Sequence, residues 1–201
     1  VLNADSINYD LIREAIYKRK YVKIVTFGSN KKCNARLIDA KFNTKKLVWN
    51  IKSSIYGIEI SYSVPLLGEH IPLSSLAPLL VIHLLGYDVK KAAKDYMKFI
   101  GTETMGILSE IKTSEITFYF YDHSHRASIL SYDSALKDLS RIFQPKNGRK
   151  IAVIGNMLNI GNISKKAHED LAELIEKANV NRLYTVGVFA KPIHDKLKDK
   201  T

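Results

Sequence analysis

Alternation of apolar and polar residues in the first third of the chain predicts a small antiparallel sheet. Four runs are rich in β-branched and aromatic residues, at 21–27, 35–42, 46–52 and 56–64. Turn-forming residues at 43–44 and at 53–54 separate the last three runs. Such spacing is typical of strands joined by short turns, so we expect these three to form a meander.

Helical spacing of apolar residues surrounds this meander. A helix over residues 6–18 is predicted, with Ile12, Ala15 and Ile16 on its inner face. After the meander, Gly68 opens a helical region that ends at Gly86. Asp88 then has the side chain and position of an N-cap residue for a further helix to about residue 99.

The second half alternates strands with helices, the order of a parallel α/β sheet. Strands are expected at 116–121, 151–155 and 183–187, and helices at 131–143, 164–178 and 189–197. The glycine-containing stretch 101–114 predicts a hinge between two domains. We place the boundary near residue 110, which gives domains of residues 1–110 and 111–201 in an α/β chain.

Composition and charge limit the classes of protein to which the chain can belong. The chain has 201 residues, of which 46% are hydrophobic, so a packed core is expected. Cys33 is the single cysteine, which fits a reducing, cytoplasmic location. No apolar run reaches the roughly 18–20 residues that span a bilayer. The net charge of +11 favours anionic partners, but the lysines are scattered and no RNA-binding aromatic motif accompanies them.

The most specific pattern is Lys150-Ile-Ala-Val-Ile-Gly-Asn-Met-Leu-Asn-Ile-Gly161, followed by His168 and by Val186-Gly187. This pattern resembles the C-terminal domain of the Mur ligases, above all the branch that adds D-alanyl-D-alanine to a UDP-linked muramoyl tripeptide. Residues 1–5 and 68–77 resemble segments of the central domain of that family. The resemblance implies part of a central ATP-binding domain over 1–110. It also implies a truncated Rossmann-like C-terminal domain with a parallel sheet over 111–201.

The resemblance also implies a chemistry. Mur ligases use ATP and Mg²⁺ to activate a carboxylate as an acyl phosphate, which an amine then attacks; here the partners would be a UDP-muramoyl peptide and D-alanyl-D-alanine. The phosphate loop and the catalytic residues of the family lie outside the span that this chain matches, and no G-x-x-x-x-G-K-[ST] pattern occurs in it. We therefore expect the isolated chain to be inactive. Two alternatives stay open: a divergent, non-catalytic Mur-like binding protein, and a basic nucleic-acid-binding module.

Four residues are candidate nucleotide contacts by this resemblance: Asp122, His125, His70 and Ser74. Asp122 takes the place of an Asp that reaches the ATP ribose in the family. Ile71 and Ser74 stand where the family has two asparagines, and Ile107 stands where it has a phosphate-binding Arg. Since an isoleucine offers neither charge nor hydrogen bond, we expect weak nucleotide binding or none.

Each of these assignments has a plainer alternative. His70 and Ser74 can simply cap a helix. Asp122 with His123 and His125 raises the alternative of a metal site, but no fourth ligand is near in the sequence, so we assign no metal.

Three further residues are candidate substrate contacts. Asn156 and Asn159 stand where the family has Asp and Glu, and each keeps polarity while losing a negative charge. His168 is a candidate ligand contact from the helix that follows. A structural role is the alternative for His168, since a histidine near the start of a helix commonly supports the fold.

Overall fold

The structure is a computed structural model of residues 1–201, and it describes all of them except 20, 100, 102, 103, 105, 126, 143, 145–147 and 198–201. The chain divides into two compact units, Val1–Ile100 and Gly101–Thr201. Each is described by itself below. None of the helices in the described part of the chain combines the length and the apolar character needed to cross a membrane.

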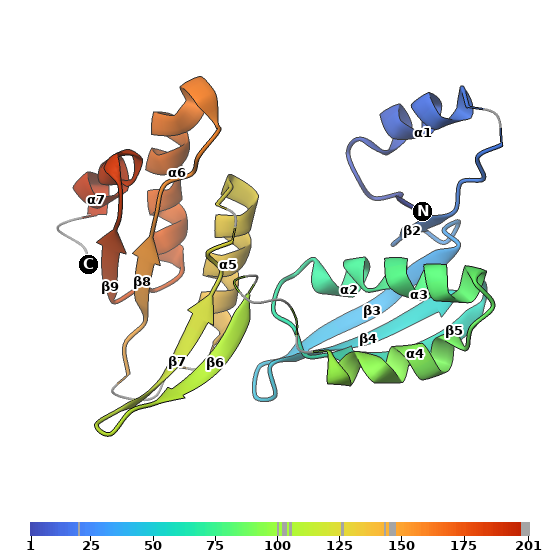
Figure 1. The fold of residues 1–201 in the computed structure, drawn as a ribbon, viewed down its shortest axis with the longest axis horizontal. Helices are drawn as coiled ribbons and strands as arrows, with labels where there is room; N and C mark the ends of the chain where they lie inside the picture. The colour runs from blue at the N-terminus through green and yellow to red at the C-terminus, as the bar shows by residue number, and fades with distance from the viewer. Residues whose placement is uncertain are drawn as a thin grey trace. The chain divides into compact units, whose positions relative to one another are not determined.

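The first unit is built on a five-stranded mixed sheet in the order β1-β2-β3-β4-β5 (Figure 1). β1 (Leu2–Asn3), β2 (Thr26–Gly28) and β3 (Ala35–Asn43) run parallel to one another. β4 (Val48–Ile55) and β5 (Ile58–Val64) complete an antiparallel meander with β3. The predicted meander is therefore confirmed.

The turn between β4 and β5 differs from the prediction. Residues 53 and 54 lie inside β4, and the chain reverses at Tyr56 and Gly57, where Ile55 pairs with Ile58. Both turn residues have positive φ, 47° and 84°. A two-residue hairpin turn of type I′ needs this geometry at both positions, and a tyrosine is not a usual signal for it.

Side chains on one face of the meander form the core of the first unit with α3 and α4. On β4, Trp49, Ile51 and Ile55 point inward, while Asn50 and Lys52 point to solvent. Three helices follow the sheet: α2 (Ile71–Ser74), α3 (Leu76–Leu84) and α4 (Val89–Asp95), the last continued by a 3-10 turn, η1 (Tyr96–Lys98). The predicted cap is confirmed, because Asp88 accepts hydrogen bonds from two backbone N–H groups of α4.

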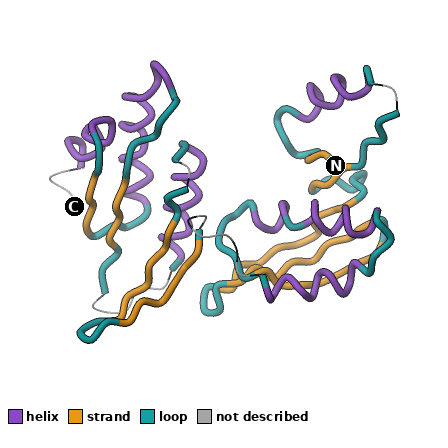
Figure 2. The backbone as a smooth tube through the Cα atoms, in the orientation of Figure 1, coloured by secondary structure: helices purple, strands orange, loops and turns teal. Residues whose placement is uncertain are grey.

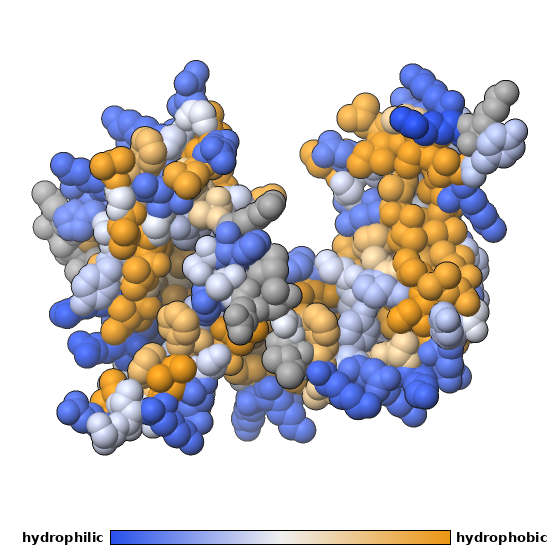
Figure 3. Space-filling view, viewed as in Figure 1, coloured by the Kyte–Doolittle hydropathy of each residue, from blue (hydrophilic) through white to orange (hydrophobic). Residues whose placement is uncertain are grey.

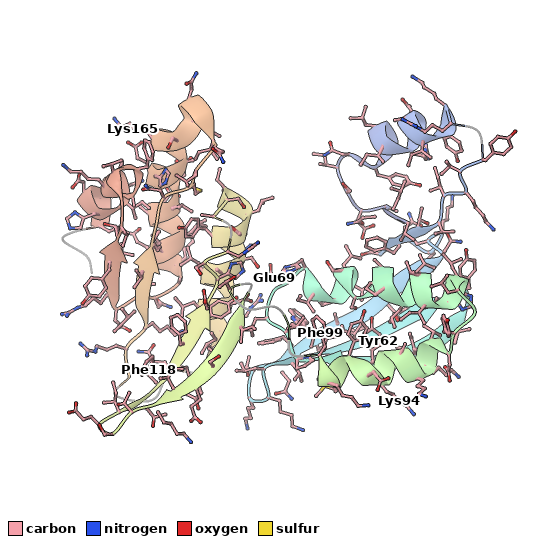
Figure 4. All side chains as sticks on the ribbon, in the orientation of Figure 1. Tyr62, Glu69, Lys94, Phe99, Phe118 and Lys165 are labelled. Carbon is pink, nitrogen blue, oxygen red and sulfur yellow. The ribbon has the colours of Figure 1, made fainter. Side chains whose placement is uncertain are left out.

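Two tyrosines tie the sheet to these helices. The hydroxyl of Tyr62, on β5, lies 2.7 Å from Oγ of buried Ser75, and the hydroxyl of Tyr96 donates to the carbonyl of Ser75 at 2.7 Å. The two rings stack with centroids 5.5 Å apart. Figure 4 labels Tyr62 between the sheet and the helices. Burial raises the pKa of both phenols, which keeps them in the neutral form that these hydrogen bonds need.

One helix of the first unit does not behave as predicted. α1 (Tyr9–Tyr17) forms where the pattern placed it, but none of its residues is buried. Ile12 is 41% exposed, so the predicted inner face has no partner in the described part of the chain. Periodicity predicts which face of a helix favours burial, and it does not show what covers that face.

The second unit begins with a strand that the sequence did not predict. β6 (Ile107–Lys112) pairs antiparallel with β7 (Thr117–Asp122) over six residue pairs. The predicted boundary near residue 110 falls inside β6, and the division between the units lies between residues 100 and 101. A boundary inside a paired strand would break its ladder, which favours a division that precedes β6.

Parallel pairing is found between β8 (Ile151–Ile154) and β9 (Arg182–Thr185). The arrows of β7, β8 and β9 point the same way in Figure 1. Among the described residues β7 is hydrogen-bonded only to β6, so the predicted three-stranded parallel ladder was only partly correct.

Helices and short 3-10 turns complete the described part of the second unit, and Figure 2 shows them beside its strands. α5 (Ile129–Arg141), α6 (Ser164–Lys177) and α7 (Lys191–Leu197) lie close to the predicted ranges, with a 3-10 turn, η3 (Val188–Ala190), before α7 and another, η2 (Gly161–Ile163), before α6. Their apolar residues form a second core with Ile154, Met157 and Leu183. Ser128 caps α5 through a capping box with Ser131.

β7 is joined to α5 by a buried polar pair. The hydroxyl of Tyr121 donates to Oδ2 of Asp138 at 3.0 Å, and Asp138 is only 2% exposed. Burial, followed by the charge of Asp138, raises the pKa of Tyr121 well above its usual value near 10.

This raised pKa predicts a loss of stability in alkali. Above about pH 10 the unfolded tyrosine loses its proton while the folded one keeps it, so a contribution that is complete below pH 10 disappears as the pH rises. We expect the free energy of unfolding of the second unit to fall in this window. Tyr121→Phe should lower stability at neutral pH, where Asp138 loses a donor, and flatten the alkaline slope. Chemical unfolding at several pH values measures this.

The matched control is Tyr119→Phe, an exposed tyrosine on the same strand. It should leave the alkaline slope as it is in the unaltered chain. Equal slopes in both variants would show that Tyr121 is not the source of the effect.

Candidate functional site

The candidate site lies where β7, β8 and β9 end. Because their arrowheads share one direction in Figure 1, the segments that follow Asp122, Ile154 and Thr185 lie on the same side of the second unit. Ligands of α/β proteins bind at the carboxyl ends of such strands. This edge holds five of the seven residues predicted from the sequence.

Asp122 closes β7 and shapes the turn that follows. Its Oδ1 accepts a hydrogen bond from the N–H of Ser124 at 3.0 Å, and its carbonyl accepts one from the N–H of Gly106 at 2.8 Å. Within the described residues the second carboxylate oxygen, Oδ2, has no hydrogen-bond partner. Asp122 is half-buried, so this oxygen is the group with which it can bind a ligand hydroxyl.

The histidines beside Asp122 differ in exposure. His123 is half-buried and meets the ring of Tyr121 edge-on, with centroids 5.9 Å apart. His125 is exposed, and its backbone N–H donates to the carbonyl of Thr104. The predicted contact residue His125 is therefore accessible at this edge.

The loop after β8 is held from three sides. The hydroxyl of Tyr132, on α5, donates to the carbonyl of Gly155 at 2.8 Å. The N–H of Met157 donates to Nε2 of His168, on α6, at 2.9 Å. Oδ1 of Asn156 accepts from the N–H groups of Phe189 and Ala190 at 3.1 and 3.0 Å. Three helical segments thus fix a loop of three residues.

His168 is fully buried, and both of its ring nitrogens are engaged. Nε2 accepts from Met157, so the ring proton lies on Nδ1, which donates to the carbonyl of Ser164 at 2.7 Å. In this arrangement His168 supports the loop, which is the structural alternative considered above. It leaves no ring nitrogen to contact a ligand directly.

Asn156 connects the two strand ends. Its amide oxygen accepts from the N–H groups of Phe189 and Ala190 in η3, and the N–H of Ala190 is shared with the carbonyl of Gly187 at 3.2 Å. Gly187 makes this close approach possible: a Cβ there would lie 2.4 Å from Nδ2 of Asn156, and its φ is 96°. Asn159 is also exposed at this edge, with a left-handed φ of 60°.

The two candidate residues in the first unit lie at either end of α2. His70 occupies the N-cap position, although its side chain makes no capping hydrogen bond, and Ser74 is the last residue of the helix. Both are exposed. Ile71, between them, packs against the first core, which explains how an apolar side chain is accommodated here.

These residues do not fit a nucleoside triphosphate with its metal ion. Ile107 is half-buried at the start of β6, and Ile71 packs against a core, so neither can meet a phosphate or a base through a polar group. In the part of the chain that the structure describes, no group of three His, Cys, Asp or Glu side chains is placed to hold a metal ion. Among these positions, only Asp122 keeps a group that can make its expected contact, a hydrogen bond to the ribose.

Sequence reasoning missed Tyr132, the residue of α5 that reaches the loop. The one available signal was an aromatic residue with a polar tip near the start of a predicted helix, and such residues usually find a hydrogen-bond partner when they are buried. It also assigned Asn156 to a ligand, whereas its oxygen is used within the protein.

Comparison with solved structures shows which class of protein shares this fold. No family model matches the chain. A crystal structure of MurF from Acinetobacter baumannii matches 95% of this chain and 39% of its own, with a TM-score of 0.75 and 19% identity. A MurF ligase from Thermotoga maritima in complex with ADP matches 90% of this chain and 40% of its own, with a TM-score of 0.65 and 19% identity. The fold is that of part of a Mur ligase.

Comparison with curated proteins shows which Mur ligase the chain is similar to. UDP-N-acetylmuramoyl-tripeptide–D-alanyl-D-alanine ligase of Rickettsia prowazekii is 28% identical over 200 residues, which is 100% of this chain and 42% of the relative. The ligase of the same name from Bacillus subtilis is 23% identical over 162 residues, 81% of this chain and 34% of the relative. The chain thus spans less than half the length of these relatives. The resemblance to a portion of this Mur ligase is confirmed.

The contact between Gly187 and Asn156 yields a stability prediction. Gly187→Ala places a Cβ against the Asn156 side chain at a φ that alanine disfavours, so we expect a loss on the order of 2–4 kcal/mol. Gly161→Ala is the matched control: its φ is also positive, at 59°, but nothing lies within 4 Å of the new Cβ. It should cost about 1 kcal/mol. Urea unfolding measures both.

A double variant tests the mechanism. With Asn156→Ala already in place, adding Gly187→Ala should cost clearly less than it costs alone, because the clashing side chain is gone. Additive losses, or equal losses at Gly187 and Gly161, would contradict the assigned contact.

Proposed function

We propose that this chain is a portion of an ATP-dependent amide ligase that adds D-alanyl-D-alanine to UDP-N-acetylmuramoyl-tripeptide. The observation that supports this most directly is the similarity to the Rickettsia prowazekii ligase over the whole chain. The motif from Lys150 to Gly161, with His168 and Gly187, supports it at the level of residues. The substrates, UDP-muramoyl peptide and D-alanyl-D-alanine, follow from this assignment.

The two units would have different tasks in such an enzyme. The first unit would be part of the central ATP-binding domain, with His70 and Ser74 near the nucleotide. The second would be part of the C-terminal domain, in which Asp122 and His125 face the nucleotide and Asn156 and Asn159 face the incoming dipeptide. The hydrogen bonds of Asn156 and His168 suit a rigid platform for these contacts.

Phosphoryl transfer depends on positive groups and metal ions around the phosphates. The described residues at this edge do not provide them, so in our proposal they come from sequence outside this chain. This chain contributes positioning, through a loop with little freedom to move. A non-catalytic Mur-like protein is the competing proposal, favoured by the apolar residues Ile71 and Ile107.

A chimera separates the two proposals. The matched part of the Rickettsia prowazekii ligase is replaced by this chain, and phosphate release that depends on D-alanyl-D-alanine is measured. We expect turnover above that of the same chimera with a disabled phosphate loop. A folded, soluble chimera that binds UDP-muramoyl tripeptide but never turns over would favour the non-catalytic protein.

The chain alone should release no phosphate from ATP, with or without UDP-muramoyl tripeptide and D-alanyl-D-alanine. The reason is that it contains no phosphate-loop pattern. A coupled phosphate assay, with the intact Rickettsia prowazekii ligase as positive control, checks this. Substrate-dependent release by the isolated chain would contradict the assignment of the catalytic residues to other sequence.

Adenine nucleotide should bind the isolated chain weakly, with a Kd of about 1 mM or higher, because three polar contacts of the family are replaced by Ile71, Ser74 and Ile107. Any binding that remains should be lost in Asp122→Ala, since Oδ2 is the acceptor available for a ribose hydroxyl. Calorimetry or chemical-shift titration with ATP measures this.

Asp170→Ala, which removes an exposed carboxylate from α6, is the control and should leave nucleotide binding unchanged. Micromolar binding that survives Asp122→Ala would show that the nucleotide site lies elsewhere.

A further inference from the structure

The side of α4 that faces solvent carries a lysine stripe, formed by Lys90, Lys91 and Lys94. Val89 and Ala93, on the other side of the helix, are buried in the first core. The three lysines are exposed, and Figure 4 shows Lys94 pointing away from the sheet. Because the buried residues fix the rotation of the helix, its packing holds three positive charges in one direction.

The acidic side chains of this segment do not neutralise the lysine stripe. Oδ1 of Asp88 accepts hydrogen bonds from two backbone N–H groups at the start of α4, at 2.9 and 3.1 Å. Asp95 forms its ion pair with Lys98, at 2.7 Å. Residues 1–100 hold 16 Lys and Arg against 8 Asp and Glu, so most of the net charge of +11 belongs to the first unit. An anionic partner therefore fits this side of the unit best.

An apolar turn lies beside the stripe. α3 ends at Leu84, and the turn into α4 leaves Leu85 and Tyr87 exposed to 66% and 70%. Gly86, between them, has a φ of 82°, and a Cβ built on it would meet no described atom within 4 Å, so the turn projects into open space. Figure 3 shows hydrophobic side chains on the first unit beside the hydrophilic band where α4 lies.

This combination of groups matches the surface of an anionic membrane. Leucine favours the boundary of the acyl chains, and tyrosine favours the level of the headgroups. Lysine covers apolar surface with its stem while its ammonium group reaches anionic headgroups. We infer that the turn of residues 85–87 and the lysine stripe together bind the surface of a bilayer that contains anionic lipid. The chain lies on this bilayer and does not span it.

Two other occupants explain less of this surface. The phosphates of duplex DNA attract lysines, but DNA offers no apolar surface to Leu85, and residues 84–98 contain no arginine for a bidentate contact. A second copy on a twofold axis would bring its own lysine stripe against this one, and like charges repel. A bilayer satisfies both the charges and the apolar turn.

The first test measures partition of the 201-residue chain onto lipid vesicles by co-sedimentation. We expect binding to mixed phosphatidylglycerol and phosphatidylcholine vesicles, weakened by salt, and little binding to phosphatidylcholine alone. Lys91→Gln combined with Lys94→Gln should lower the partition coefficient by about ten-fold or more, because each lysine near an anionic surface contributes about five-fold. Lys165→Gln combined with Lys166→Gln is the matched control: both lysines are exposed on α6, and their loss should leave partition unchanged.

The second test locates the apolar contact. Leu85→Ser should lower partition without changing its salt dependence, whereas Leu130→Ser, at a leucine 82% exposed on α5, should have no effect. Tyr87→Trp should show a blue shift of fluorescence on the mixed vesicles, and Leu130→Trp should show none. Trp49, the single native tryptophan, is buried and adds a constant background. Circular dichroism confirms that the variants fold.

The remaining outcomes overturn the inference. They are the absence of vesicle binding, equal binding to phosphatidylcholine alone, equal losses in the two pairs of lysine variants, and an unshifted spectrum of Tyr87→Trp. Binding to duplex DNA without binding to vesicles would favour a nucleic-acid surface, and self-association that Leu85→Ser abolishes would favour a second copy. These measurements use no nucleotide and no muramoyl peptide, so their result is independent of the proposed ligase function.

Discussion

The hydrogen bond from the Met157 N–H to Nε2 of His168 is the contact on which the strand edge of the second unit depends. A buried imidazole with an unpaired nitrogen would be costly, and a buried backbone N–H without an acceptor equally so. Each therefore satisfies the other, and the carbonyl of Ser164 fixes the ring by accepting from Nδ1. The direction in which the chain leaves β8 follows from this pair, and so does the position of Asn156.

Asn156 shows how geometry can persist when charge is lost. An aspartate in its place would accept the same two N–H groups of η3, and the asparagine does so with its amide oxygen. An asparagine in place of an aspartate therefore removes a negative charge from the edge without removing the hydrogen bonds between the loop after β8 and η3. Gly187 has the complementary constraint, since any side chain there would occupy the space of this amide.

Local chemistry made much of the fold predictable. Asp88 predicted the start of a helix, and the alternation of apolar and polar residues predicted β3, β4 and β5. Both signals depend only on residues that are close in sequence. The turn at Tyr56 and Gly57 escaped because tyrosine rarely adopts positive φ, and β6 because Ser109, Glu110 and Lys112 make it look like a loop. At the site, Asp122 ends its strand as predicted, whereas the oxygen of Asn156 is bonded to residues 33 and 34 positions further along the chain, which local patterns do not predict.

The apolar residues at positions 71 and 107 and the rigid strand edge of the second unit indicate which parts of the chain can bind a ligand. Ile71 packs against the first core and Ile107 is half-buried at the start of β6, so neither position offers a polar group to a ligand. What remains for binding is the geometry of the second unit: an available carboxylate oxygen at Asp122 and a loop held by three helices. Such a surface can orient a bound molecule without stabilising developing phosphate charge. Phosphoryl transfer needs positive groups or metal ions around the phosphates, and the described residues of this edge do not provide them.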